Sequence, residues 1–351
     1  MTRDVAQSAI HGIGEGNVAR LIDVHAHDYT DSYLDACKRE DSGFTHYIRD
    51  DGRLIVLQDD AVALAAPQPM PPPEHRIALM DEAGVQIQAL SVSAPNVFRF
   101  PGALRVPLTR DLNDEFSQIA ADSGGRLRFF VSLPLPDVDA ALEELDRALA
   151  LPGAVGVVLC TTIDHHTLDD ARFGPLWEEL SRRRATVFVH PTVPICTEGV
   201  REFALSLALA FLAETTNAIG RLVYSGTISR HEGINWIFTH LGGTAPFLLL
   251  RYDNYYKMFP ENREHIDRPP SEIMSDLYFD TCTMHAPALR CTVDSVGVEQ
   301  LVFGSDYPHV PGGIQRFVDI FNSVGLTDAE QETIGWTTAA RLIGEPAAAS
   351  R

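Results

Sequence analysis

The stretch "LIDVHAHDYT", residues 21–30, decides the fold and supplies the first candidate site residues. It begins as a short apolar run, as a buried strand does, and then carries His25 and His27, which are separated by one residue. Alternate residues of a strand point to the same side. The two imidazoles are therefore expected to project together from the end of this strand. The rest of the chain has to show whether they are metal ligands.

Seven further runs resemble this one. They are rich in β-branched and apolar residues, as strands covered on both faces by helices are. With the first, they occupy residues 21–26, 85–92, 127–133, 154–160, 186–190, 235–240, 277–281 and 301–306. Amphipathic segments between them predict helices at 74–84, 108–124, 137–150 and 171–184. Eight strands alternating with helices predict an α/β fold, a (β/α)₈ TIM barrel. A doubly wound open sheet is the alternative, and it is disfavoured because no Gly-rich phosphate loop follows the first strand.

The chain is expected to form a single barrel domain over residues 21–345, after an N-terminal leader (1–20) and before a tail (346–351). One connection, residues 28–73, is too long for a simple loop between a strand and a helix. Within it "THYIRDDGRLIVLQ" alternates around Asp51-Gly52, which predicts a hairpin. "PQPMPPP" (67–73) then forms an extended spacer. We expect a small β insertion over the barrel mouth.

Composition excludes several partners. The formal net charge of −20 argues against nucleic acid, which requires a basic face. No apolar window is long enough for a membrane span. Five cysteines without a CxxC spacing predict reduced thiols and a cytoplasmic location.

Polar residues recur at the predicted strand ends. His25 and His27 end the first strand, His190 the fifth and His240 the sixth, and Asp306 ends the eighth run. In a barrel these ends open on one face, where catalytic groups collect. Imidazole suits zinc and related divalent metals, and three histidines with one carboxylate leave a coordination position for water. The sequence therefore predicts a metal site.

Four motifs carry a resemblance to a family: "DVHAH" (23–27), "VFVHP" (187–191), "HLGGTAPFLLLRYDN" (240–254) and "LVFGSDYP" (301–308). With these, the chain resembles the amidohydrolase superfamily from about residue 21 to 343, and within it the aminocarboxymuconate-semialdehyde decarboxylase-like branch. This resemblance implies a metal-dependent, non-oxidative decarboxylase, a carboxy-lyase, acting on an unsaturated or aromatic carboxylic acid.

The resemblance also implies roles for single residues. His25, His27, His190 and Asp306 would hold one divalent metal ion, zinc in the first place and manganese as the alternative. His240 would act as general acid/base beside a metal-bound water, and Asp306 would share in the proton transfer. The lysine that bridges two metals in other superfamily members is absent, since the fourth strand carries Cys160 instead. One metal is therefore expected.

Arg251 follows His240 on the next predicted helix. In the resembling decarboxylases an arginine here binds the substrate carboxylate in the neighbouring subunit's site, which implies a homodimer. A surface ion pair is the alternative. Aminocarboxymuconate-semialdehyde decarboxylase has a second arginine shortly before the first barrel helix, and the matching stretch of this chain, "AVALAAPQPM" (61–70), has none. It also has a tryptophan after the "HP" of the fifth strand, where this chain has Thr192. We therefore expect a different, more apolar acid, to which Phe98, Phe100 and Met284 are suited.

A second function stays open: a metal-dependent hydrolase that cleaves an ester, lactone or amide of a small cyclic substrate with the same groups. A metal-binding protein without activity is a third alternative. It predicts that a metal ligand or His240 is absent, whereas the sequence contains all of them. The roles of His165, His166, His285 and His309 are left open, as is a role of Cys160 as a soft ligand.

Overall fold

The computed structural model describes residues 20–345, so the expected leader up to residue 19 and the tail 346–351 lie outside the described residues. Eight strands form one parallel sheet in the order β1-β5-β6-β7-β10-β11-β12-β13. Each lies within or overlaps a run predicted above. Their bounds are β1 Leu21–His27, β5 Val85–Ser91, β6 Leu127–Val131, β7 Ala154–Cys160, β10 Thr186–His190, β11 Asn235–Phe238, β12 Tyr278–Asp280 and β13 Leu301–Val302.

The two outer strands of this sheet meet and close it. Backbone hydrogen bonds run from Val24 N to Phe303 O (3.0 Å) and from His27 N to Tyr307 O (2.7 Å). The buried Asp23 carboxylate accepts from the backbone N–H of Ser305 (3.1 Å) and from its hydroxyl (2.6 Å). The Asp23–Ser305 contact joins residues 282 positions apart. The predicted (β/α)₈ barrel is confirmed.

Inward-facing residues of the strands fill the barrel. Ile22 and Val24 of β1 lie in one cluster with residues from six other strands. Phe130 and Phe188 stack with ring centroids 5.0 Å apart, and Phe188 lies edge-on to His25 at 5.2 Å. The interior is thus a packed apolar core, and the polar strand ends lie directly on top of it.

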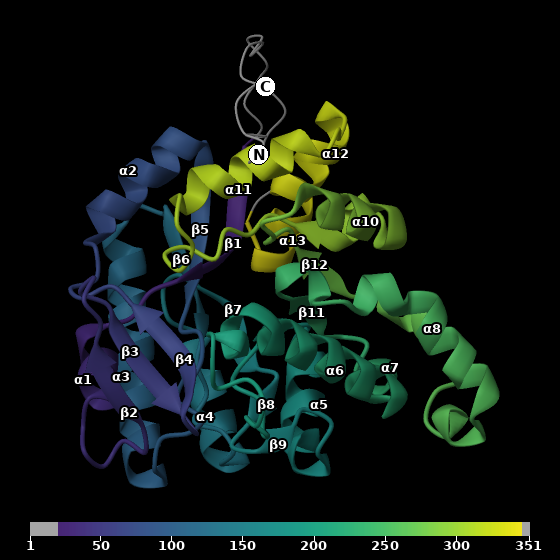
Figure 1. The fold of residues 1–351 in the computed structure, drawn as a ribbon, viewed down its shortest axis with the longest axis horizontal. Helices are drawn as coiled ribbons and strands as arrows, with labels where there is room; N and C mark the ends of the chain where they lie inside the picture. The colour runs from purple at the N-terminus through teal and green to yellow at the C-terminus, as the bar shows by residue number, and fades with distance from the viewer. Residues whose placement is uncertain (1–19, 346–351) are drawn as a thin grey trace, which may run out of the picture.

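Helices surround the sheet (Figure 1). The four predicted helices are present, although α3 begins six residues before its predicted start and runs through Pro107. The α-helices are α1 Asp31–Cys37, α2 Pro73–Ala83, α3 Gly102–Asp122, α4 Val138–Ala148, α5 Gly174–Arg183, α6 Phe211–Tyr224, α7 Thr227–Arg230, α8 Ala245–Met258, α9 Pro270–Met274, α10 Ala286–Val296, α11 Gly313–Ser323, α12 Asp328–Glu332 and α13 Thr338–Ile343. Short 3₁₀ turns are η1 Ala171–Phe173, η3 His240–Gly242, η4 Pro260–Arg263 and η5 Val298–Gln300, and π-helical turns are η2 Ser206–Ala210 and η6 Thr333–Thr337.

The long connection after β1 contains a second, antiparallel sheet of β2 (Thr45–Ile48), β3 (Leu54–Gln58) and β4 (Ala61–Ala66). The predicted hairpin is β2–β3, and its turn contains Gly52 at φ 83, where glycine avoids steric strain. Helix α1 and strand β4 were not predicted. The three strands β2, β3 and β4 show that the small β insertion is present, and it lies beside the barrel in Figure 1.

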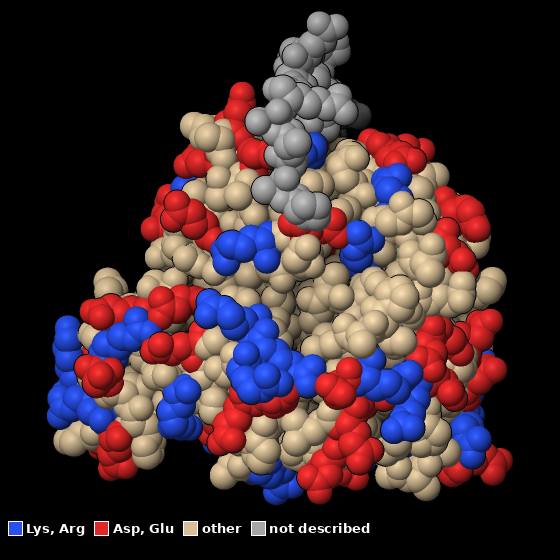
Figure 2. Space-filling model, turned by 180° about the vertical axis from the view of Figure 1, so that it is seen from behind, with Lys and Arg blue, Asp and Glu red and all other residues tan. Residues whose placement is uncertain are grey.

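Helix α8 extends away from the barrel (Figure 1). On the face that is turned away from the viewer in Figure 1, basic and acidic side chains are interspersed (Figure 2). Among the described residues, no helix is both long and apolar enough to cross a membrane. All five cysteines are free, and the cytoplasmic location stays a prediction.

Candidate metal centre

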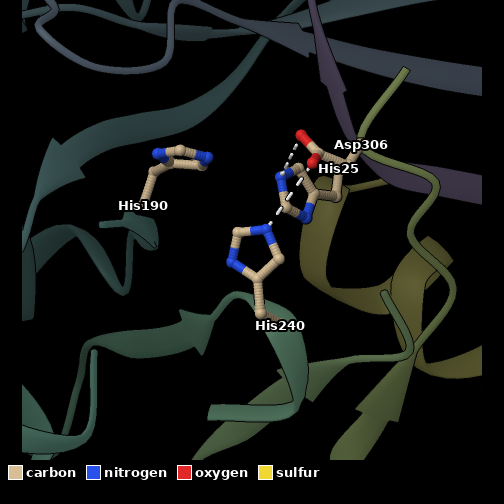
Figure 3. A group of neighbouring side chains, drawn as sticks. All are labelled: His25, His190, His240 and Asp306. Atoms are coloured by element: carbon tan, nitrogen blue, oxygen red, sulfur yellow. Dashed lines mark ion pairs between the residues drawn. The ribbon is translucent and has the colours of Figure 1, made fainter. Parts of the chain in front are cut away.

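The polar strand ends converge at one point of the barrel mouth. The ligand atoms of His25, His190, His240 and Asp306 all lie within 4.8 Å of one another, and Figure 3 shows these side chains pointing toward a common centre. His27 joins them, because its Nε2 lies 3.1 Å from His25 Nε2 and 3.1 Å from Asp306 Oδ1. The structure thus brings together all five residues selected from the sequence.

Three of the imidazoles are held in the same way, with Nδ1 bound to an acceptor. A carbonyl oxygen or a carboxylate can only accept, so each Nδ1 carries the proton and each Nε2 offers its lone pair to the centre. The contacts are His25 Nδ1 with Asp280 Oδ2 (2.5 Å), His27 Nδ1 with Ser91 O (3.2 Å) and His190 Nδ1 with Pro191 O (2.7 Å). This is the arrangement of preorganised metal ligands.

The spacing of the donor atoms fits a single cation. Two ligands of a tetrahedral ion with bonds of about 2.0–2.1 Å lie about 3.3 Å apart, close to the 3.1 Å between the Nε2 atoms of His25 and His27. Asp306 Oδ1 is buried and has no hydrogen bond of adequate geometry within residues 20–345. A cation would satisfy it. The residues present therefore fit a divalent metal.

At His27, His190 and Asp306, burial and charge set the protonation states that metal binding needs. Burial lowers the pKa of His27 to about 3 and that of His190 well below its usual value. Burial alone would raise the pKa of Asp306, but the surrounding imidazoles of His240, His25 and His27 hold it well below its ordinary value. Neutral imidazole and ionised carboxylate are the forms that bind a cation.

His240 differs from the other histidines. Its Nδ1 is buried and has no hydrogen-bond partner in the described part of the chain, and its Nε2 lies 3.6 Å from Asp306 Oδ2. It follows β11 in a tight turn with φ 54, and Asp306 has φ 55. Left-handed backbone at a non-glycine residue costs about 1–2 kcal/mol. Both residues thus place their side chains at the centre from a strained backbone, a conformation that nine other non-glycine residues of the described chain share.

Asp280 was not selected from the sequence. It is fully buried at the end of β12, where Oδ2 faces His25 and Oδ1 accepts from the backbone N–H of Cys282 (3.0 Å). Burial lowers the pKa of His25, but the Asp280 carboxylate, together with Asp306 and Cys282, raises it well above the usual value. The signal was available, since Asp280 is the penultimate residue of the predicted strand 277–281, near the end where the histidines also lie on their strands.

A cavity of about 450 Å³ opens beside the centre. His190, His240 and Asp306 form one part of its lining, and mostly apolar side chains form the rest. Met284, His285 and His309 also line it, whereas Phe98 and Phe100 do not, contrary to the expectation for those two phenylalanines.

The remaining candidates lie outside the cavity. Arg251 is exposed on α8, where its guanidinium lies 5.1 Å over the Tyr255 ring. His165 contacts Arg99 in an exposed loop. Cys160 is buried, which raises the pKa of its thiol, and it joins neither group of candidate ligand atoms. Arg251 therefore does not reach the site of its own chain, and its expected role in a neighbouring subunit stays a prediction.

Comparison with known proteins identifies a family and several similar proteins. A family model described as Amidohydrolase matches residues 22–344. The chain is 30% identical over 259 residues to the 6-methylsalicylic acid decarboxylase of Penicillium expansum, covering 72% of this chain and 80% of the relative.

Solved structures share the fold. The 5-carboxyvanillate decarboxylase of Sphingomonas paucimobilis is similar with a TM-score of 0.80 and 21% identity, over 93% of this chain and 100% of that chain. A dihydroxybenzoic acid decarboxylase from Polaromonas, solved with bound manganese, gives a TM-score of 0.77 and 22% identity, over 93% and 97%.

Proposed function

The chain belongs to the amidohydrolase family, and on this premise we propose that it is a metal-dependent, non-oxidative decarboxylase of an aromatic or unsaturated carboxylic acid. One observation carries the proposal: three oriented imidazoles, a buried carboxylate and His240 meet at a cavity. A relative with 30% identity is named as a decarboxylase of an aromatic acid, 6-methylsalicylic acid.

We assign the metal ligands to His25, His27, His190 and Asp306. Each of the three histidines has its Nδ1 fixed by an acceptor, whereas His240 does not. One divalent ion fits this set, and zinc is our first assignment because three imidazoles and one carboxylate are donors that it prefers. Manganese, bound in the Polaromonas decarboxylase, is the alternative.

The reaction breaks the bond between the carboxylate carbon and the ring or chain carbon. When bound, the metal supplies a Lewis acid that fixes and polarises a substrate oxygen. The electron pair of the broken bond stays on the substrate carbon, and His240 donates a proton to that carbon as CO₂ leaves. Asp306, whose Oδ2 lies 3.6 Å from His240 Nε2, shares in this proton transfer. The apolar lining of the cavity keeps water from the carbon that is being protonated.

We further propose a homodimer in which Arg251 serves the partner's site. Helix α8 extends away from the barrel (Figure 1) and presents Phe247 and Leu250, which are 78% and 80% exposed. Large exposed apolar side chains that gather on one element are typical of an interface. A guanidinium there can hold a carboxylate by two hydrogen bonds.

The test of the reaction is mass spectrometry of metal-loaded protein with hydroxybenzoates, naphthoates, muconates and pyrimidine carboxylates, beside esters, lactones and amides. Loss of CO₂ from an acid supports the proposal. Hydrolysis of an ester, lactone or amide, with every acid unchanged, would establish the hydrolase instead.

The test of His240 is its replacement by alanine. Turnover should fall by about 10²- to 10⁴-fold, as expected for a lost general acid, while bound metal stays near one per chain. Metal lost together with activity would make His240 a ligand. His165→Ala, in an exposed loop outside the cavity, is the matched control.

A further inference from the structure

One wall of the cavity is a continuous apolar surface built by η2 and the start of α6. Leu207, Ala208, Phe211 and Leu212 all line the cavity. The wide π-helical turn places the neighbours Leu207 and Ala208 on the same side of the helix as the neighbours Phe211 and Leu212. Such turns are frequent at functional sites. The Phe211 ring lies edge-on to the His190 ring, with centroids 6.0 Å apart. The apolar wall thus begins directly beside a metal ligand.

Strand β4 extends this wall. Ala63, Leu64 and Ala65 line the same cavity, and the Ser206 hydroxyl donates to Val62 O at 2.9 Å, which ties η2 to β4. Leu207 packs against Ala63 and Phe211 in one cluster. The insertion and the π-helical turn therefore form a single apolar surface against which the body of a substrate would lie.

The charges around the cavity suffice for one carboxylate. No lysine or arginine is among the described residues that line it. A divalent ion and the proton that His240 donates carry three positive charges, and the Asp306 and Asp280 carboxylates balance two of them, which leaves one positive charge. The Arg53 guanidinium donates to Ala65 O at 3.1 Å and is not part of the lining. The partner's Arg251, in the function proposed above, is assigned to the same, reacting carboxylate.

We propose that this cavity selects aromatic acids with a single carboxylate and an apolar substituent, an alkyl group or a fused ring, and rejects acids with a second anionic group. This inference rests on the proposed decarboxylation. An alkyl substituent gains affinity by leaving water for the wall, about fourfold per buried methylene. A second carboxylate against Leu207 or Phe211 would be desolvated without a counter-charge, which should cost at least about 100-fold in affinity.

The experiment compares three substituents on one scaffold. With metal-loaded protein, kcat/KM and Kd are measured for 2-hydroxybenzoate carrying hydrogen, ethyl or carboxylate at each free ring position in turn. At the ring position where ethyl has the largest effect, ethyl should raise kcat/KM and lower Kd by about tenfold relative to hydrogen. Carboxylate at that position should lower kcat/KM and raise Kd by about 100-fold or more. Equal constants for ethyl and carboxylate, or no gain from ethyl at any position, would overturn the inference.

Paired variants locate the effect on the wall. Leu207→Arg places a guanidinium in the lining and should raise the relative affinity for the carboxylate-substituted acid by about tenfold or more. Leu209→Arg is the matched control, because Leu209 belongs to the same turn but is 56% exposed and absent from the lining. Equal effects of both variants would refute the assignment to the wall.

The two proposals can fail separately. If no acid loses CO₂, the proposed function fails, and the Kd ratios of the wild-type protein still decide the inference. If acids with a second carboxylate lose CO₂ as well as the alkylated ones, the inference fails and the function stands. The wild-type ratios also suffice if Leu207→Arg does not fold.

Discussion

Replacing Asp280 with asparagine should weaken metal binding although Asp280 is no ligand. In the native site Oδ1 accepts backbone N–H groups, from Cys282 at 3.0 Å and Leu241 at 3.5 Å, and Oδ2 accepts the Nδ1 proton of His25. The backbone donors are fixed, so the asparagine oxygen should stay with them. Its NH₂ group then faces His25 Nδ1. The imidazole must move its proton to Nε2, and a protonated Nε2 cannot ligate.

The expected magnitude follows from what such partners contribute. Loss of the carboxylate behind a ligating histidine costs about 10- to 100-fold in metal affinity, which corresponds to about 1.4–2.8 kcal/mol. The side chain is fully buried and its contact with His25 measures 2.5 Å, which places the expectation at the upper end. Competition with a chromophoric chelator measures the metal Kd, and inductively coupled plasma mass spectrometry measures the bound metal.

The control is Asp294→Asn, since Asp294 is 65% exposed on α10 and pairs only with Arg290 within the described residues. Its metal Kd should equal that of the wild type. A metal Kd for Asp280→Asn within twofold of the wild type would refute the reasoning, because His25 would then ligate without its carboxylate. Far-ultraviolet circular dichroism of both variants verifies that the barrel is intact.

Three further predictions follow from the same geometry. Removing the metal with a chelator should lower the Tm by about 4–6 °C, since the ion stabilises only the folded site; an unchanged Tm in calorimetry would contradict the assigned centre. Gly304→Ala should weaken metal binding in the same chelator competition, because the added Cβ would lie 2.7 Å from His25 Cβ. Gly174→Ala is the control and should leave the metal Kd unchanged, because its added Cβ would have no atom within 4 Å and its φ is −47°. Arg251→Ala should raise KM by about 10- to 100-fold, the loss of charged hydrogen bonds to a carboxylate, and hybrids of Arg251→Ala with His240→Ala subunits should regain activity; hybrids without activity would place Arg251 outside the partner's site.

Much of the fold follows from local pattern in the sequence. Each of the eight strands lies within or overlaps a mostly apolar run of the sequence, as a parallel strand covered on both faces requires. The hairpin at Asp51-Gly52 is encoded by two residues that favour its turn. Strand β4 was not predicted, because "AVALAA" is apolar throughout and shows neither a strand nor a helix period.

The candidate metal centre also follows partly from the sequence and partly from the tertiary structure. The sequence alone determined the ligand candidates, because a strand places alternate residues on one side and a barrel brings the strand ends to one face. Only the tertiary structure decided that Asp280 orients His25, which lies 255 residues away, and that Arg251 does not reach its own site. It also decided that the π-helical turn and β4 form one apolar wall. The physical reason is range: spacing along the chain encodes which face a residue occupies, whereas the partner across that face depends on how the closed sheet brings distant segments together.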